Sequence, residues 1–434
     1  MGKRILVSIL MVLLVLALAF TGSTLLFSAR YDALTQKSAA AQASQEELPD
    51  ELPAQAPAAA VTALPQETPE AVAASAESPE VLSQSPSTDP AEILSRMTLE
   101  EKICQLLMVT PEALTGQETV TGFNNDAMDA LAQYPVGGLI FFGANLETAD
   151  QATAMLSAIR ETAATLTVPG LLLGVDEEGG SVSRATPLGV TEYEDMRVYG
   201  DAGDTEAAYQ IGLTLGSQLK DLGFNLDFAP VADVLSNDEN TVVSVRSFGS
   251  DPELVSTMVS MEIAGFEEAG ILSCPKHFPG HGSTSGDTHE GLAVTDRTLE
   301  ELRECDFLPF QAAIESGVPM IMMGHMTMSA LDEDTPASMS QEIVTGLLRE
   351  ELGYDGIIIT DSVGMGAIAD HYTSAEAVVQ ALSAGCDMVL CPTNLSAVVE
   401  AVKNAITSGT LSEDQIDQSV RRVLEAKVRY GVIS

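Results

Sequence analysis

The sequence predicts an α/β protein with a single (β/α)8 barrel of the TIM type. From about Asp89 onward the hydrophobic pattern is strongly periodic, and the roughly 340 residues that remain suit one barrel. Short apolar runs alternate there with longer helical patterns, an order typical of parallel strands joined by helices. An open doubly wound sheet is the alternative, but the sequence has no glycine fingerprint for a dinucleotide and no P-loop.

The first element along the chain is a hydrophobic segment in residues 1–30. Lys3 and Arg4 precede an apolar stretch, residues 5–27, that is long enough to span a bilayer, which takes about 20 residues. The two positive charges place the rest of the chain outside the cytoplasm. We therefore expect an uncleaved transmembrane anchor. The alternative is a signal peptide cleaved near Ser23, which gives a secreted protein.

Residues 31–90 form a second region that is rich in Ala, Pro, Ser, Gln and Glu and almost free of aromatic residues. Such a segment cannot bury enough apolar surface to offset the entropy of ordering it. The sequence therefore predicts a disordered acidic linker, followed by a globular domain over residues 91–434.

The charge and cysteine content limit the partners of the chain. Acidic residues outnumber basic ones 63 to 20, for a net charge of −43. Nucleic-acid binding requires clustered Lys and Arg, so the composition argues against that class of partner. The five cysteines form no C-x-x-C pair, and no disulfide framework is predicted.

Eight apolar runs supply the strands of the predicted barrel. They are Gln105–Val109, Gly138–Phe142, Leu171–Val175, Asn225–Ala229, Ile271–Cys274, Met320–Met323, Gly356–Thr360 and Asp387–Cys391. The helical patterns include Ala149–Thr165, Glu206–Leu222, Pro252–Ala269, Leu299–Ser316, Ser374–Ala384 and Ser412–Tyr430. In such a barrel the active site lies at the C-terminal ends of the strands.

Polar residues follow four of these runs, which predicts that they meet at one rim. Asp176 follows the third run, Lys276 and His277 the fifth, His325 the sixth and Asp361 the seventh. A single strand-end aspartate is often only a helix N-cap, and this alternative applies to Asp361. The coincidence of four polar strand ends favours a functional site.

The loop from Lys276 to His289 is the most informative segment, because it holds three of the five histidines. Pro279 and Gly280 prevent a regular helix there. A loop beyond a strand end is a usual place for catalytic or binding groups. A metal site is the second interpretation, although no helix supports the four-residue spacing of His277 and His281. A purely structural loop is the third.

Several segments together match a known family pattern. They are residues 97–103, residues 174–184 (Asp-x-Glu-Gly-Gly-x-Val-x-Arg), residues 246–249, residues 276–282 continued by 287–289, and residues 359–368. On these segments residues 91–434 resemble glycoside hydrolase family 3, and within it the β-N-acetylglucosaminidase branch. The histidine loop is the most specific match, since in this branch a histidine replaces the usual carboxylic acid/base.

The resemblance implies a retaining β-N-acetylglucosaminidase that needs no metal and no cofactor, and it assigns roles. Asp361 would be the nucleophile, His289 the general acid/base and Asp287 the partner that orients His289. The residues that would hold the non-reducing sugar are Asp176, Arg184, Arg246, Lys276 and His277. An imidazole suits proton transfer near neutral pH.

The chain departs from the family pattern in two ways. Many members carry a second, C-terminal domain, whereas this chain ends with its barrel; we expect one domain to suffice, because the acid/base lies on a barrel loop. Ser362 stands where relatives often have a second aspartate, with little expected effect.

The expected partner is a carbohydrate, a terminal N-acetylglucosaminide of peptidoglycan or its fragments, and the expected state is a monomer. Peptidoglycan follows from the resemblance together with the extracytoplasmic location. Three alternatives stay open. One is a phosphorylase with the same residues, and another is a wall-binding barrel without turnover. The third is a metal-dependent hydrolase that uses His277, His281, Asp287 and His289.

Overall fold

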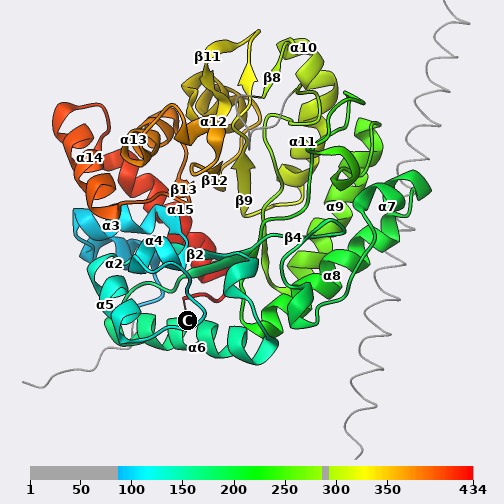
Figure 1. The fold of residues 1–434 in the computed structure, drawn as a ribbon. Coiled ribbons are helices and arrows are strands. Elements are labelled where there is room, and N and C mark those ends of the chain that lie inside the picture. The colour runs from blue at the N-terminus through cyan, green and yellow to red at the C-terminus, as the bar shows by residue number, and fades with distance from the viewer. Residues whose placement is uncertain (1–86, 286–292, 434) are drawn as a thin grey trace, which may run out of the picture. The chain divides into compact units, whose positions relative to one another are not determined.

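The computed structural model describes residues 87–285 and 293–433 (Figure 1). Within these two ranges, no helix is both long and apolar enough to cross a membrane. The predicted hydrophobic segment (residues 1–30) and the predicted linker up to residue 86 lie outside the described residues, so both stay predictions.

Eight parallel strands form the barrel, and each overlaps one of the predicted apolar runs. They are β1 (Leu107–Val109), β2 (Gly138–Phe141), β3 (Leu172–Val175), β6 (Leu226–Asp227), β7 (Leu272–Ser273), β9 (Met320–Met323), β12 (Ile357–Ser362) and β13 (Met388–Leu390). The sheet order is β7-β6-β3-β2-β1-β13-β12-β9, so strands that follow one another along the chain lie side by side. The first strand also pairs with the last, β1 with β13.

The remaining gap, between β7 and β9, is bridged by the chain just after β7. The N–H of Met322 donates to the carbonyl of Pro275 (3.0 Å), and the N–H of Phe278 donates to the carbonyl of Met322 (2.8 Å). The N–H of Gly324 then donates to the carbonyl of Phe278 (2.8 Å). The predicted TIM-type arrangement is therefore confirmed, and the histidine loop begins as part of the barrel wall.

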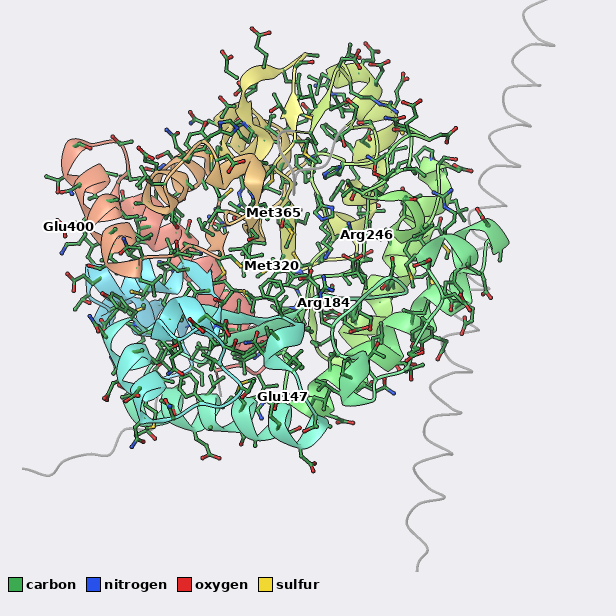
Figure 2. All side chains as sticks on the ribbon, viewed as in Figure 1. Glu147, Arg184, Arg246, Met320, Met365 and Glu400 are labelled. Atoms are coloured by element: carbon green, nitrogen blue, oxygen red, sulfur yellow. The ribbon has the colours of Figure 1, made fainter. Side chains whose placement is uncertain are left out.

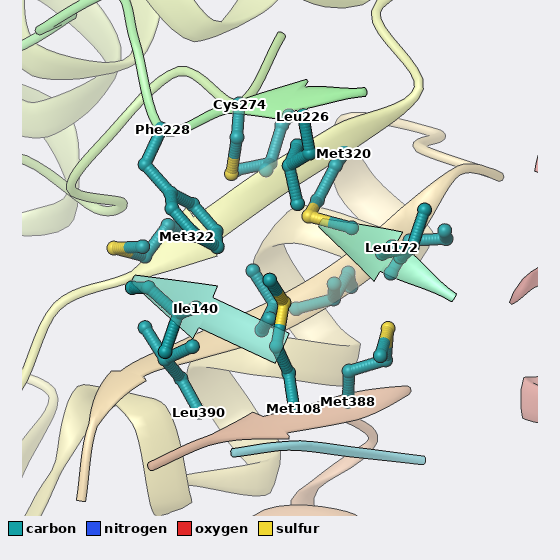
Figure 3. Packing of buried hydrophobic residues seen from close by; sticks show 14 of the residues in the cluster. Met108, Ile140, Leu172, Leu226, Phe228, Cys274, Met320, Met322, Met388 and Leu390 are labelled. Carbon is teal, nitrogen blue, oxygen red and sulfur yellow. The ribbon is translucent and has the colours of Figure 1, made fainter. Parts of the chain in front are cut away.

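The interior of the barrel is filled largely by methionine and aliphatic side chains (Figure 3). Met108, Met320, Met388 and Phe228 are all buried there. A Cβ at Gly174 would lie 2.7 Å from the Cε of Met108, so this strand position accepts only glycine without movement of Met108. Flexible methionines fill irregular spaces well, which suits a closed barrel interior.

Helices surround the strands (Figure 1). The predicted helices are present as α6 (Ala149–Leu166), α8 (Thr205–Leu222), α9 (Pro252–Ala269), α13 (Ser374–Ala384) and α15 (Glu413–Arg429). The predicted helix 299–316 is divided into α10 (Leu299–Glu301), the π-helical η4 (Leu302–Asp306) and α11 (Phe307–Glu315). Helices α8 and α9 pack closely, because a Cβ at Gly212 would lie only 2.2 Å from the carbonyl oxygen of Glu262.

Further helices complete the ring. They are α2 (Pro90–Arg96), α3 (Leu99–Gln105), α4 (Pro111–Thr115), α5 (Asn125–Gln133), α7 (Met196–Ala202), α12 (Gly366–Ala369), α14 (Leu395–Ser408) and the π-helical η6 (Glu342–Glu351). Helix α3, the predicted opening helix, starts with a capping box between Thr98 and Glu101.

Two small sheets lie outside the barrel. Strands β4 (Glu177–Gly179) and β5 (Val182–Ser183) form a hairpin directly after β3. Strand β10 (Thr327–Met328) pairs with both β8 (Val294–Thr295) and β11 (Asp332–Pro336). Both sheets follow the C-terminal ends of barrel strands, where they build the surroundings of the predicted site.

Candidate active site

A network of alternating charges links the ends of β3 and β7. Asp176 directly follows β3, and its Oδ1 lies 2.6 Å from the Nζ of Lys276. The same Nζ lies 2.6 Å from Oε1 of Glu178. Arg246, from η3 (Ser244–Arg246), donates to both oxygens of Glu178, from Nε at 2.8 Å and from Nη2 at 2.7 Å. The structure thus brings together three of the predicted sugar-binding residues, Asp176, Arg246 and Lys276.

The charges in this network hold one another in the ionised state. Burial alone would raise the pKa of Glu178, but Arg246 and Lys276 outweigh it and lower that pKa. Burial would lower the pKa of Lys276, whereas Asp176 and Glu178 raise it above the ordinary value. The result is a buried but balanced set of carboxylates and cations at the end of the barrel. Such groups hydrogen-bond well to sugar hydroxyls.

His277 is oriented by a carboxylate that the sequence did not point to. Asp233 is fully buried in the loop after β6, and its Oδ2 lies 2.8 Å from Nδ1 of His277. Its Oδ1 accepts the backbone N–H groups of His277 (3.2 Å) and His281 (2.6 Å). Because Asp233 occupies Nδ1, the His277 ring presents Nε2 as its other polar atom. The carboxylate therefore fixes both the ring and the turn that carries it.

Aromatic packing and amide contacts hold the rest of the histidine loop. The ring of Phe278 stacks on Phe307 of α11, with centroids 5.3 Å apart. Nδ2 of Asn240 donates to the carbonyl of His281 at 2.9 Å, and Nδ1 of His281 lies 2.8 Å from Oγ1 of Thr284. The peptide bond between Lys276 and His277 is cis. The loop is thus a fixed part of the scaffold up to Ser285.

Asp361 lies near the C-terminal end of β12, with its Oδ1 accepting the N–H of Ser362 (2.7 Å). Helix α12 begins later, with Met365 at its N-cap, so Asp361 is not the cap of that helix. Burial would raise the pKa of Asp361, but His277 and His325 outweigh it and lower that pKa. The carboxyl is therefore ionised at neutral pH, and His277 and His325 stabilise its ionised form.

His325 supports this end of the barrel from the next strand. It is fully buried, with Nδ1 2.7 Å from Oγ of Ser338 and Nε2 3.0 Å from the carbonyl oxygen of Ser362. Burial lowers the pKa of His325, while Asp361 opposes that change. All four predicted strand-end positions therefore lie at one rim.

The structure does not bring Arg184 into the charge network. Its side chain is exposed just after β5, although Figure 2 shows it on the same side of the barrel as Arg246. Its backbone hydrogen-bonds the carboxylate of Glu177, and its charge helps to lower the pKa of that group against the effect of burial. Within residues 87–285 and 293–433 its guanidinium forms no hydrogen bond and no ion pair. Its role in sugar binding stays a prediction.

Asp287 and His289, the predicted acid/base pair, lie outside the described residues. The two ends of their segment are described, and they lie together. Ser285 and Val294 exchange backbone hydrogen bonds of 3.0 and 3.2 Å. Oγ of Ser283 also donates to Oγ1 of Thr295 (3.1 Å). Both arms of the loop are thus held by the sheet that contains β8.

The metal interpretation gains no support from the part of the chain that the structure describes. No group of three or more His, Cys, Asp or Glu side chains is placed there to hold a metal ion. The rings of His277 and His281 meet edge to face with centroids 5.8 Å apart.

A cavity of about 430 Å³ lies next to the residues that precede β9 and β12, and its lining includes Tyr354 and Arg429. It is at the N-terminal end of the strands, away from the charge network.

Comparison with known proteins identifies the family of the chain. Residues 98–426 match the model of the glycosyl hydrolase family 3 N terminal domain. The chain is 34% identical to Beta-hexosaminidase LpqI of Mycobacterium tuberculosis over 78% of its own length and 85% of that protein. It is 32% identical to Beta-hexosaminidase A of Pseudoalteromonas piscicida over 69% of its own length.

A solved structure agrees with these relatives. The glycoside hydrolase family 3 β-N-acetylglucosaminidase from Paenibacillus sp. str. FPU-7 superposes with a TM-score of 0.73 at 37% identity, over 77% of this chain. The matched region spans only 54% of the Pseudoalteromonas protein and 63% of the Paenibacillus chain. On the family match and the identity to its relatives, this chain belongs to glycosyl hydrolase family 3.

Proposed function

We propose that the chain is a retaining β-N-acetylglucosaminidase that removes terminal N-acetylglucosamine through a covalent glycosyl-enzyme. The observation that carries this proposal is an ionised Asp361 at the rim that also holds Lys276, Asp176 and Arg246. The Paenibacillus structure, that of a β-N-acetylglucosaminidase, supports the choice of N-acetylglucosamine as the sugar, and the Beta-hexosaminidase relative agrees with a hexosaminide.

The nucleophile in this proposal is Asp361. Its lowered pKa keeps it a carboxylate at neutral pH, and the N–H of Ser362 fixes one oxygen. The other oxygen is available to attack C1 of the sugar. Because β12 is a strand of the barrel wall, the carboxylate is positioned by a rigid element, which favours a near-attack geometry.

The sugar at the non-reducing end is held by the charge network. The carboxylate of Asp176 accepts hydrogen bonds from hydroxyls, Lys276 and Arg246 donate them, and His277 offers Nε2. Arg184 is assigned to the same task from the family pattern. These contacts bind a polar ring without a metal or an organic cofactor.

Proton transfer in this proposal is done by His289 with Asp287 as its partner. The sequence pattern of the loop supports this assignment. The residues that flank the segment, Ser285 and Val294, are hydrogen-bonded to each other, so both ends of the segment lie close together. The imidazole donates a proton to the leaving oxygen and later accepts one from water. The aspartate holds the ring and stabilises the imidazolium.

We further propose that the natural substrate is peptidoglycan or its fragments, met outside the cytoplasm by a domain anchored through residues 5–27. The location is supported by the N-terminal sequence, with its two basic residues before a long apolar stretch. Peptidoglycan is supported by that location together with the family resemblance. Digestion of isolated cell walls and cell fractionation test these two points separately.

The experiment that tests the activity is release of N-acetylglucosamine from an aryl N-acetyl-β-glucosaminide. We expect turnover by the wild type, unaffected by EDTA, with water rather than phosphate as acceptor. The first-formed sugar should be the β anomer by NMR, since a covalent intermediate inverts C1 twice. An α anomer contradicts the retaining mechanism, a sugar phosphate makes the chain a phosphorylase, and loss of activity in EDTA restores the metal interpretation.

A further inference from the structure

A second buried carboxylate lies next to Glu178, and the site as described so far gives it no task. Glu177 is the first residue of β4, is fully buried and pairs with Ser183 of β5. Successive side chains of a strand point to opposite faces. Glu178 contacts Arg246 and Lys276, so the Glu177 side chain serves the other face of the hairpin. The family pattern in residues 174–184 leaves the position of Glu177 open.

The carboxylate of Glu177 holds three consecutive residues at the end of the hairpin. Its Oε1 accepts the hydroxyl of Ser183 at 2.5 Å, and its Oε2 accepts the N–H of Ala185 at 2.7 Å. The N–H of Arg184 also donates to this carboxylate. Burying a carboxylate is costly unless its oxygens accept hydrogen bonds, and these three donors meet that need.

The hairpin that contains Glu177 is fixed to the barrel. The N–H of Glu177 donates to Oδ1 of Asp227 at 2.9 Å, and Asp227 is fully buried in β6, which pairs with β3. At the turn of the hairpin, the N–H of Ser181 donates to Oδ1 of Asp195 (2.8 Å). The hairpin is thus held at its start, at its turn and at its end, and the carboxylate of Glu177 holds the end.

Arg184 lies between two residues that Glu177 holds. Its side chain is exposed, whereas the next residue, Ala185, is fully buried. The fixed backbone therefore determines the point from which the long guanidinium side chain extends. Fixing this point reduces the conformational freedom that is lost when the side chain binds a ligand.

We propose that Glu177 is a positioning residue for sugar binding that acts through Arg184. The inference rests on the proposed function, in which Arg184 helps to hold the non-reducing sugar. Glu177 does not touch the sugar, because it is fully buried and both of its oxygens hold the hairpin. The two neighbouring carboxylates then have parallel tasks. Glu178 orients Arg246 by direct hydrogen bonds, and Glu177 orients Arg184 through the backbone.

The test is a double-mutant cycle between Glu177→Gln and Arg184→Ala. Glutamine keeps the shape of Glu177, but its amide nitrogen is a donor and cannot accept an N–H or a hydroxyl. Arg184→Ala should raise KM about tenfold or more, as expected for the loss of a hydrogen bond from a charged group. Glu177→Gln should raise KM about three- to tenfold, with kcat changed less than about twofold. In the Arg184→Ala background, Glu177→Gln should leave KM unchanged, because the side chain that it positions is absent.

A purely structural role of Glu177 gives a different pattern. If Glu177→Gln only lowers the fraction of folded enzyme, the apparent kcat falls and KM stays that of the wild type. If the variant disturbs the whole site, KM rises equally in both backgrounds. Either pattern contradicts the proposal, and so does a wild-type KM in Arg184→Ala.

Ser183→Ala is a milder variant that keeps the test decisive if glutamine at the buried position prevents folding. Ser183 is half-buried, and the substitution removes only its hydroxyl from Oε1 of Glu177. KM should rise about two- to threefold when Arg184 is present and should not change when Arg184 is alanine. A rise of the same size in both backgrounds contradicts the proposal.

Glu112→Gln is the matched control. Oε1 of Glu112 also holds a loop, by accepting the N–H of Val120 (2.9 Å) and the Nδ2 of Asn145 (2.6 Å), and neither hydrogen bond involves the hairpin. Any effect of this variant on KM should be the same with and without Arg184. An effect that disappears in the Arg184→Ala background contradicts the specific link between Glu177 and Arg184.

Equilibrium binding of N-acetylglucosamine, measured by calorimetry, separates this inference from the proposed function. The Kd should follow the same cycle as KM. If the wild type binds the sugar with this coupling but does not cleave the aryl glycoside, the proposed activity is refuted and the inference stands. If the wild type cleaves the glycoside and the coupling between Glu177 and Arg184 is absent, the inference is refuted and the proposed function stands.

Discussion

Single residues in the site are held by partners of opposite charge rather than by packing alone. Lys276 lies between Asp176 and Glu178, each at 2.6 Å, and Arg246 completes the row. Removal of one member leaves a buried charge without its partner, which is costly. These side chains are therefore preorganised before a sugar arrives, which reduces the entropy lost on binding.

The periodicity of the sequence located the residues that directly follow a strand, whereas Arg246, further along the chain, was predicted only from the family resemblance. Asp176, Lys276 and Asp361 were predictable, because each comes within two residues of an apolar run. Asp233 lies in the long loop after β6, where periodicity carries no information. Its only local signal was its place beyond a strand end. Glu178 lay inside a recognised segment, but its pairing with Arg246 depends on tertiary structure.

Substrates with different leaving groups distinguish the proposed role of His289 from that of His277. A sugar alkoxide needs protonation to leave, whereas a nitrophenolate does not. His289→Ala should therefore slow cleavage of a natural disaccharide by about 10²–10⁴-fold and slow glycosylation by the aryl substrate much less. His277→Ala should weaken both substrates alike, because both share the sugar it holds. Single-turnover rates on both substrates decide, and equal losses in His289→Ala return the loop to a binding or metal role.

Among the elements, the chain after β7 combines two tasks. Residues 275–278 complete the hydrogen bonds of the barrel wall, and the next residues form the loop that carries the site. The sequence predicted β7 from an apolar run of four residues, yet only Leu272 and Ser273 are regular strand. Pro275 and Pro279 lack an N–H, and the wall is continued by irregular hydrogen bonds that periodicity does not reveal. The π-helical η4 was likewise hidden inside a helical pattern.

Gly282 fixes how closely this loop approaches the segment that contains Asp233. A Cβ at Gly282 would lie 1.9 Å from the carbonyl oxygen of Val234, so the loop backbone must move if a side chain is added. Gly282→Ala should lower kcat/KM at least tenfold and destabilise the fold by about 1–3 kcal/mol. Gly122→Ala, where nothing lies within 4 Å, is the control and should match the wild type. A fully active Gly282→Ala means that the loop tolerates the displacement.

The whole domain is closed by contacts between its first and last described elements. Strand β1 pairs with β13. Helix α15 packs against α3. Lys427 of α15 is fully buried, and its Nζ donates to Oε1 of Gln105 (2.8 Å). At this scale the fold class was predictable, because eight runs and the helices between them specify a barrel. The relation of residues 1–86 to that barrel stays a prediction.

Lys427 gives the domain a dependence on pH. Burial lowers the pKa of Lys427 to about 7, below the unfolded value of about 10.4. The unfolded chain binds the proton more tightly, so stability rises as the pH rises from 7 to 10. Lys427→Met should therefore be more stable than the wild type by about 1–3 kcal/mol at pH 7, with the gain shrinking toward pH 10. Urea unfolding measures this. Lys403→Met is the control, because Lys403 is half-exposed. Its free energy of unfolding should differ little from that of the wild type at both pH 7 and pH 10.

The central claim, that Asp361 forms a covalent bond to the sugar, is tested most directly by the mass of the trapped intermediate. His289→Ala lacks the base for deglycosylation, so with a dinitrophenyl N-acetyl-β-glucosaminide it should accumulate glycosyl-enzyme. Peptide mass mapping should find one N-acetylhexosaminyl group, on the peptide that contains Asp361 and on no other. A variant that turns over the substrate without this adduct, or that carries the sugar on another carboxylate, contradicts the account.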